Sequence, residues 1–288
     1  MILGRLIPRD GTAIGRLIRT PRALFGAVVI LVVLIGALGA GWLMPFDSED
    51  MDFDSLLLDP SWPHVLGTDQ LGRDTFSRLI LGSQVALQVS IGAVGLGLLL
   101  GVPLGLVSVT IGGWVDDVIM RIMDAIVVFP ALLVAVALAA AIGNSLGTVI
   151  LAIGVANVPW LARITRSQAL ALRELDFVAA AQAAGTSTIK IMIRHILPNA
   201  IAPVIVQSTL GMGYAVLAEA ALGFIGVGVT PPTPTWGNML QAAFPFLEKQ
   251  PSLSVAPGVA IFLLVLAFNL LGDALRDILD PRLRGVVR

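Results

Sequence analysis

The stretch DFVAAAQAAGTSTIKIMIRHILPNA, residues 176–200, is a polar interruption in a strongly apolar chain. Of the 288 residues, 57% are hydrophobic and only 13% are charged, roughly half the charged share of a soluble domain. A bilayer core about 30 Å thick needs about 20 helical residues, so the sequence predicts a polytopic α-helical membrane protein. The uncharged runs are 24–46, 79–115, 125–162, 196–218, 220–247 and 250–272.

The residues of the polar stretch predict two short helices at the membrane surface. Residues 168–184 are rich in helix formers, and Gly185 suits the position just after a helix end. Thr186 or Ser187 can cap the second helix, and Pro198 marks the boundary before the next apolar segment. One face of the second helix carries its apolar residues, Ile189, Met192, Ile193 and Ile196.

Composition excludes several functional classes. A single Tyr and 6% aromatic residues argue against an outer-membrane barrel with aromatic girdles. The absence of Cys excludes thiolate metal sites, and the only histidines, His64 and His195, complete no metal cluster. Neither lysine, Lys190 or Lys249, follows a G-x-x-x-x-G stretch, so the chain has no phosphate-binding P-loop. We therefore expect no catalytic residue, metal site or cofactor in this chain.

The distribution of charge predicts the topology. The arm 1–23 carries five Arg and one Asp, whereas 47–78 carries eight acidic residues and two Arg. By the positive-inside rule, the N-terminus is cytoplasmic and 47–78 is extracytoplasmic. Six spans then return the tail 273–288 to the cytoplasm, together with a basic loop over 163–199. The predicted spans are 24–45, 84–111, 122–142, 146–162, 201–225 and 254–272, the last five forming a permease core over 79–272 that follows a first unit, 24–78.

The cytoplasmic loop resembles the coupling loop of permease subunits of bacterial ABC importers. That loop has the pattern E-A-A, three residues, Gly, nine residues and I-x-L-P, and it docks on an ATPase subunit. Ala180, Ala181, Gly185, Leu197 and Pro198 fall at matching positions. Two positions depart from the pattern: Ala179 replaces the Glu, and His195 takes the Ile position.

Three further segments are similar to dipeptide and oligopeptide permeases, and their order and tail resemble the C-type subunit. HVLGTDQLGRDTFSRLILGSQ at 64–84 is similar to the segment before the second span. GFIGVGVTPPTPTWGNML at 223–240 is similar to the exit of the fifth span, and FNLLGDALRDILDPRLRG at 268–285 to the tail. The extracytoplasmic motif comprises Gly67, Thr68, Asp69, Gly72, Arg73 and Asp74.

The resemblance implies an all-α membrane protein with six transmembrane helices and a cytoplasmic two-helix coupling loop, the architecture of type I ABC importer permeases. It also implies peptide import across the bacterial inner membrane, with a second homologous permease, two ATPase subunits that bind ATP and Mg, and an extracytoplasmic peptide-binding protein. Lipid is expected around the spans, and no nucleic acid is expected. Phe177 is the predicted docking anchor, because burying an aromatic side chain is worth about 1.5–3 kcal/mol.

Several residues keep more than one interpretation. Asp69, Arg73 and Asp74 suggest an external cation site, but turn chemistry with Asp74 as a helix cap is favoured. Glu219 either lines the translocation path or pairs with another helix or subunit. As an alternative function, an ion-coupled secondary transporter would use Glu219 as its proton carrier. Near the third span, Asp124 is expected to pair with Arg121, and a close-packing face is expected from Gly92, Gly95, Gly97 and Gly101.

Overall fold

The computed structural model describes residues 20–279, so the arm before residue 20 and the tail after 279 lie outside the described residues. The described residues form helices and loops without a β-strand, which confirms the all-α prediction. The elements are α2 (Pro21–Leu43), α3 (Thr75–Ile111), α4 (Gly113–Val128), α5 (Ala131–Ile142), α6 (Leu146–Arg173), α7 (Asp176–Ala183), α8 (Thr188–Ile191), η2 (Met192–Ile196), α9 (Leu197–Phe224), α10 (Trp236–Ala243), η3 (Phe244–Phe246) and α11 (Ser252–Leu279).

Five helical units are long and apolar enough to cross a membrane, and a sixth crossing is reached if α4 and α5 together form one broken span. The five units are α2, α3, α6, the continuous 188–224 helix and α11. The sequence predicted one span over 122–142, but α4 and α5 meet there at a bend of 86°. Pro130 explains the bend, because the residue before a proline is driven out of the helical conformation, and Phe129 has φ −83° and ψ 124°.

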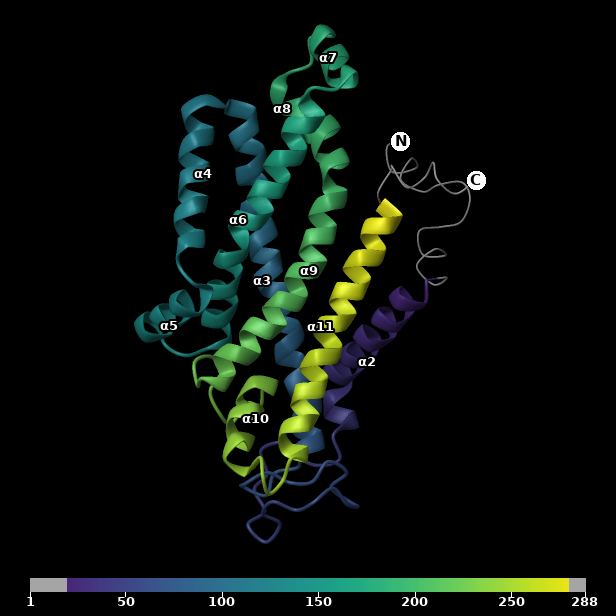
Figure 1. Ribbon diagram of the computed structural model, residues 1–288, viewed down its shortest axis with the longest axis vertical. Helices are drawn as coiled ribbons and strands as arrows, with labels where there is room; N and C mark the ends of the chain where they lie inside the picture. The colour runs from purple at the N-terminus through teal and green to yellow at the C-terminus, as the bar shows by residue number, and fades with distance from the viewer. Residues whose placement is uncertain (1–19, 280–288) are drawn as a thin grey trace.

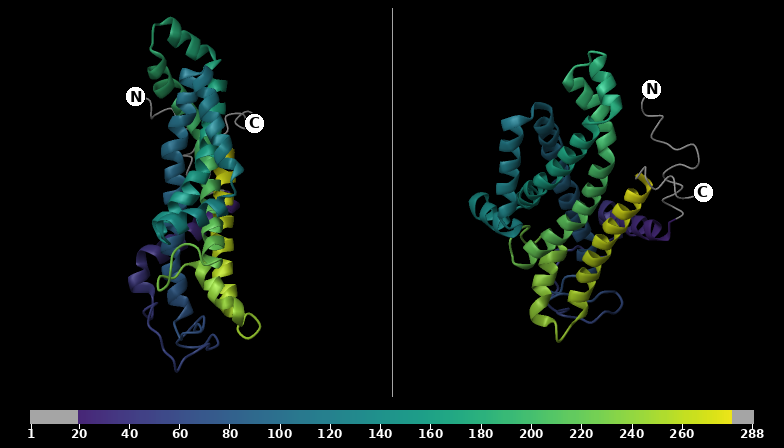
Figure 2. Two further views of the ribbon diagram at one scale, coloured as in Figure 1. Left: turned by 90° about the vertical axis from the view of Figure 1, so that its left-hand side faces the viewer. Right: turned by 45° about the horizontal axis from the view of Figure 1, so that its top comes forward.

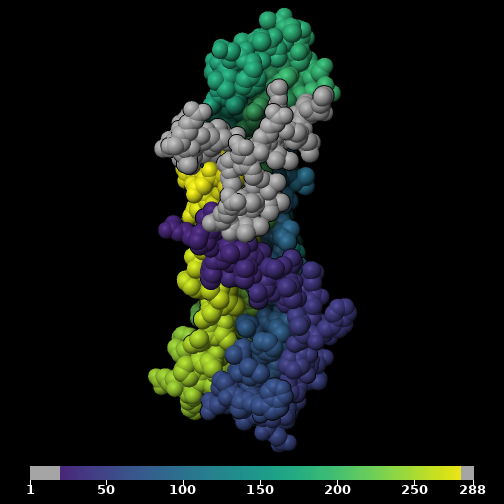
Figure 3. All heavy atoms as spheres, turned by 90° about the vertical axis from the view of Figure 1, so that its right-hand side faces the viewer, coloured from purple at the N-terminus to yellow at the C-terminus, as the bar shows by residue number. Residues whose placement is uncertain are grey.

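The elongated bundle has α7 and α8 at one end and α10 near the other (Figure 1). Helices α7 and α8 project at one end, and the loops of 44–74 lie beside α10 at the other. The turned views in Figure 2 keep this separation. Helix α2 packs against α3 and α11, and Figure 3 shows it across one side of the bundle. A Cβ on Gly26 of α2 would lie 2.8 Å from the carbonyl oxygen of Ala267 on α11, so only a glycine permits this approach.

Glycines bring α3 and α6 into the most extensive helix contact of the bundle. A Cβ on Gly101 would lie 2.8 Å from the carbonyl oxygen of Val158, and one on Gly105 would lie 2.5 Å from that of Ala162. The predicted close-packing face is confirmed at Gly101 but wrong at Gly95, which has no atom within 4 Å of a built Cβ. Small residues of this kind let membrane helices approach closely. The interface also includes Gly92 and Gly97.

Candidate functional site

The predicted helix break in the polar stretch is confirmed at Gly185. Helix α7 ends before Gly185, whose φ of 75° lies in the left-handed region. The amide of Gly185 donates to the carbonyl of Gln182 (2.9 Å), and the amide of Thr186 donates to that of Ala181 (3.1 Å), the pairing of a Schellman cap. Ser187 precedes α8 but makes no side-chain capping hydrogen bond. We call residues 175–197, the two short helices and their turn, the hairpin.

An apolar cluster roots the hairpin in the bundle. Val178 of α7 is 1% exposed and packs with Val109 of α3 and Ala169 of α6. Because these contacts reach two long helices, the hairpin is a continuation of the bundle core rather than a loosely held connection. The other buried members of the cluster are Ile191, Met192 and Ile196.

The opposite face of α7 is exposed and partly apolar. Phe177 is 40% exposed and Leu175 is 47% exposed, and Ala180 is also exposed. Ala181 is half-buried at the edge of the apolar cluster. Since the hairpin projects beyond the ends of the neighbouring helices (Figure 1), this face is accessible to a partner protein.

His195, Leu197 and Pro198 lie where the hairpin joins α9, and all three are half-buried. Residues 192–196 form a turn of π-helix, closed by the Leu197 amide bonded to the Met192 carbonyl. Such turns accompany irregularities in a helix, and Pro198 supplies one because it lacks an amide donor. The side chain of Asn199 donates to the carbonyl of His195 at 2.6 Å. These residues shape the connection, whereas Phe177 and Ala180 form the exposed face.

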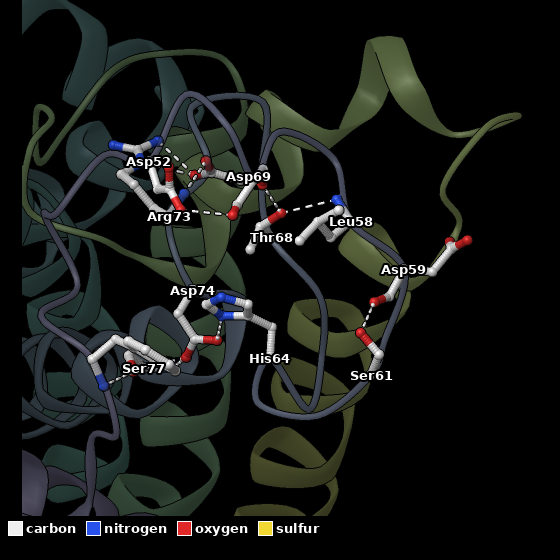
Figure 4. A network of polar contacts seen from close by, with 12 residues as sticks. Asp52, Leu58, Asp59, Ser61, His64, Thr68, Asp69, Arg73, Asp74 and Ser77 are labelled. Atoms are coloured by element: carbon white, nitrogen blue, oxygen red, sulfur yellow. Dashed lines mark hydrogen bonds and ion pairs between the residues drawn. The ribbon is translucent and has the colours of Figure 1, made fainter.

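At the other end of the molecule, Asp69 is the centre of a buried ionic network (Figure 4). Its Oδ2 atom lies 2.8 Å from Nη2 of Arg73 and 3.6 Å from Nε of Arg78. Its Oδ1 atom accepts hydrogen bonds from the amides of Leu71 (2.8 Å) and Arg73 (3.1 Å). The Asp69 carboxylate therefore interacts with the backbone of its own turn and with the side chains of Arg73 and Arg78. Nη1 of Arg78 also donates a hydrogen bond to the carbonyl of Ser48 at 2.9 Å, which extends the network.

Asp74 caps α3, as the turn interpretation predicted. Its Oδ2 atom accepts hydrogen bonds from the amide and the hydroxyl of Ser77, both at 2.8 Å. Its Oδ1 atom lies 3.0 Å from Nδ1 of His64, and the ring of Phe46 stacks on His64 with centroids 4.5 Å apart. Both carboxylate oxygens are thus used by the protein.

The remaining motif residues hold the turn by close contact. Gly67 and Gly72 both have φ of 74°, and a side chain on either would collide with backbone, at Leu58 and at Asp52 respectively. The hydroxyl of Thr68 accepts from the amide of Leu58 at 2.9 Å and donates to the carbonyl of Ser55 at 2.5 Å. Within residues 20–279, no group of three or more potential metal ligands occurs.

Asp52 is the exposed part of the same turn. Its carboxylate accepts a hydrogen bond from the hydroxyl of Ser55 at 2.6 Å and another from the amide of Asp54 at 3.0 Å. These bonds favour the charged form, and they hold the pKa of Asp52 below its ordinary value, with the Ser55 bond as the largest cause. The charge of Asp52 therefore supports the local turn.

Ion pairs between α4 and α6 differ from the sequence expectation. Asp124 was expected to pair with Arg121, but its Oδ1 atom lies 2.7 Å from Nη2 of Arg163 on α6. A second pair, between Asp116 and Arg166, was not anticipated. The paired residues are 39 and 50 positions apart in the sequence, so local spacing cannot predict these ion pairs. The sequence showed only that charged residues lie beside two long apolar runs.

Glu219 lies inside the subunit, where its side chain is 3% exposed. It lines neither the small cavity beside Asp69 nor the apolar cavity of about 170 Å³ between α5, α6 and α9. Among residues 20–279, no ion pair involves Glu219. The interpretation of Glu219 as a path-lining residue stays a prediction.

Comparison with known proteins identifies the family. The family model described as "Binding-protein-dependent transport system inner membrane component" matches residues 93–285. A second model, "N-terminal TM domain of oligopeptide transport permease C", matches residues 11–60. These matches cover most of the chain, including the hairpin and all of α9.

Individual relatives and a solved structure agree with the family models. The glutathione transport system permease protein GsiD of Escherichia coli O157:H7 is 40% identical over 268 residues, covering 93% of this chain and 88% of the relative. The dipeptide transport system permease protein DppC of Alkalihalophilus pseudofirmus is 41% identical over 263 residues, covering 91% and 86%. A chain of the inward-facing MetNI methionine ABC transporter shares the fold, with a TM-score of 0.59 at 18% identity over 70% of this chain and 96% of that one. The chain therefore belongs to the inner membrane components of binding-protein-dependent transport systems, in the C-type peptide permease branch.

Proposed function

We propose that this chain is the membrane-spanning permease subunit of an ATP-driven importer that translocates di- or oligopeptides delivered by an extracytoplasmic binding protein. Family membership supports the transport role, and relatives at 40–41% identity are named for glutathione and dipeptide transport. The chain has no P-loop of its own. In this proposal the energy comes from partner ATPase subunits, which bind ATP and Mg.

The observation that carries the proposal is the exposed aromatic face of a firmly rooted hairpin. Phe177 is 40% exposed on α7, while Val178, the next residue, is fully buried against α3 and α6. A partner that binds Phe177 would therefore move the long helices α3 and α6 together with the hairpin. We assign Phe177, Ala180, Ala181 and Gly185 to the docking helix and its turn, and His195, Leu197 and Pro198 to its connection with α9.

The orientation follows from placing the hairpin in the cytoplasm, where ATP is available. The loops of 44–74 and α10 then lie on the extracytoplasmic side, since they occupy the opposite end of the bundle (Figure 1). The acidic composition of 47–78 and the basic composition of 163–199 support the same orientation. The proposal places the protein in the bacterial inner membrane with both termini in the cytoplasm.

On the extracytoplasmic side, Gly67, Thr68, Asp69, Gly72, Arg73 and Asp74 form the rigid turn that precedes α3. We propose that this turn shapes the surface that receives the binding protein. The proposed complete transporter contains this chain, a second homologous permease, two ATPase subunits and the peptide-binding protein, surrounded by lipid.

Reconstituted transport tests the energy source. The chain is co-expressed with its second permease and ATPases, and the complex is reconstituted in proteoliposomes. ATP is enclosed in the lumen, and a radiolabelled dipeptide and the binding protein are added outside. Uptake should require ATP and should persist when an uncoupler collapses the proton gradient. Uptake that continues without nucleotide and stops with the uncoupler would instead identify an ion-driven transporter.

A further inference from the structure

A small cavity lies between the first turn of α3 and the helices α10 and α11. Its volume is about 20 Å³, which is enough for one water-sized species but not for a polyatomic ion such as sulfate. The apolar wall comes from α10 and α11, and the polar wall comes from α3 and the turn before it. The polar lining residues are Asp69, Gln70, Arg73, Thr75 and Arg78.

The residues that line the cavity carry an excess of one positive charge, because two arginines share one acid. The side chains of Arg73 and Arg78 are only 6% and 5% exposed, and both pair with Asp69. The other buried acid of the turn, Asp74, does not line the cavity, and it pairs with His64. Burying an uncompensated charge is costly. The cavity therefore favours an anion and disfavours the external cation that the residue types alone suggested.

The polar wall offers unused hydrogen-bond donors, whereas the oxygen atoms of Asp69 are already occupied. Oδ1 of Asp69 accepts from the amides of Leu71 and Arg73, and Oδ2 accepts from Nε of Arg73 at 2.8 Å (Figure 4). By contrast, the hydroxyl of Thr75, a residue that is 2% exposed, is buried without a hydrogen-bond partner. Among residues 20–279, Nη1 of Arg73 and Nη2 of Arg78 form no hydrogen bond either.

Gln70 is compatible with an anion in the cavity. Its side-chain oxygen is buried without a hydrogen-bond partner, so that atom does not hold the amide in one orientation. A half-turn about the last side-chain bond exchanges the oxygen and the nitrogen and leaves the shape of the group almost unchanged. Gln70 can therefore direct its N–H donors toward the cavity.

The start of α3 adds to the attraction for an anion. Thr75 is the first residue of α3, directly after the cap Asp74, and a helix N-terminus carries a partial positive charge. We propose that the cavity binds one small monovalent anion, of the size of chloride, through the hydroxyl of Thr75 and the guanidinium groups of Arg73 and Arg78. The anion neutralises the excess charge where α3 meets α10 and α11. This binding does not depend on the proposed transport function.

Thermal unfolding of the purified full-length chain in detergent tests the site. The chain is compared in sodium chloride and in sodium gluconate at equal ionic strength, because gluconate is too large for the cavity. Chloride should raise Tm by about 2–4 °C and reach saturation, and bromide should act in the same way. Thr75→Val should need about tenfold more chloride for half of this effect, because it removes a hydrogen bond to a charged ion.

The same variant separates anion binding from a purely structural role of Thr75. In gluconate, Thr75→Val should be as stable as the native chain, since the hydroxyl has no hydrogen-bond partner in the protein. Thr75→Ser keeps the hydroxyl and should keep the chloride response. Thr165→Val is the matched control, because Thr165 of α6 is also fully buried, with an unpartnered hydroxyl, but does not line the cavity. Its response to chloride should be that of the native chain.

Crystals grown in sodium bromide locate the ion directly. Anomalous diffraction should show one bromide in hydrogen-bonding contact with the Thr75 hydroxyl in the native chain and in Thr165→Val. An empty or water-filled cavity in the native crystals would overturn the proposal. So would an equal chloride response in Thr75→Val and the native chain, or an equal loss of stability by Thr75→Val in both salts. If Thr75→Val does not fold, the bromide position in the native crystals decides alone.

Discussion

Arg166 of α6 grips both carboxylate oxygens of Asp116 on α4, with Nε 2.7 Å from Oδ1 and Nη2 2.5 Å from Oδ2. Asp124 and Arg163 form a second contact between the same helices at 2.7 Å. Because α4 precedes the sharp bend into α5, these pairs fix its direction beside α6. Two-point pairing of Arg with a carboxylate adds geometric specificity to electrostatic attraction.

Removing the Arg166 side chain should loosen α4. Arg166 and Asp116 are 33% and 17% exposed, so Arg166→Ala should reduce the free energy of unfolding by about 1 kcal/mol rather than by the larger value of a fully buried pair. Arg166→Lys should recover only part of this, because Lys lacks the planar fork. Thermal unfolding in detergent measures both, with the exposed Glu248→Ala as control. Equal stability of all four proteins would contradict the structural role.

The α3–α6 interface predicts a sharp difference between two glycines of one helix. Gly105→Ala places a Cβ 2.5 Å from the carbonyl oxygen of Ala162 and should cost about 1–3 kcal/mol through overpacking. Gly95→Ala meets no atom within 4 Å and should be neutral or stabilising by up to about 1 kcal/mol, because Ala favours the helix. Thermal unfolding compares the two, and a reversed order would show that the helices are packed differently.

Asp69→Asn should locally unfold the turn that precedes α3. The change leaves Arg73 and Arg78 buried without their shared carboxylate, and breaking a buried pair costs about 3–5 kcal/mol. Limited proteolysis should show faster cleavage within 44–74, with the α7–α8 end unaffected. Asp54→Asn, an exposed acid of the same segment, serves as the matched control. If Asp69→Asn resists protease as well as the control does, Asp69 does not organise this turn.

The effect of a substitution at Gly185 should depend on how readily the new residue adopts a left-handed backbone conformation, and not on the size of its side chain. Its φ is 75° and a Cβ there meets no atom within 4 Å, so the cost of a side chain is conformational. Gly185→Val should lose about 1–2 kcal/mol, and Gly185→Asn should lose less, because Asn enters the left-handed region more readily. Exchange of amides in α7 and α8 provides the measurement. Equal exchange in Gly185→Val and Gly185→Asn would show that the left-handed backbone is not the constraint.

Interactions between residues close in the sequence could be predicted from it, whereas pairs of residues on different helices could not. Gly185 and Asp74 act within a few residues of their own positions, so their roles as helix stop and helix cap followed from residue type. The bend between α4 and α5 was missed although Pro130 was visible, because the apolar run around it suggested one unbroken span. The pairs of Asp124 with Arg163 and of Asp116 with Arg166 depend on how helices cross, which spacing along the chain does not specify.

Phe177 is the proposed anchor of an ATPase subunit, and co-purification tests this role directly. The native chain, Phe177→Ala and the control Phe262→Ala are each co-expressed with the second permease and a tagged ATPase. Phe262 is a 62% exposed aromatic residue of α11, so it controls for loss of exposed aromatic area. The native chain and Phe262→Ala should be retained equally, while Phe177→Ala should be retained at least about tenfold less, matching the loss of one buried aromatic contact. Equal retention of all three proteins would show that Phe177 does not anchor the ATPase.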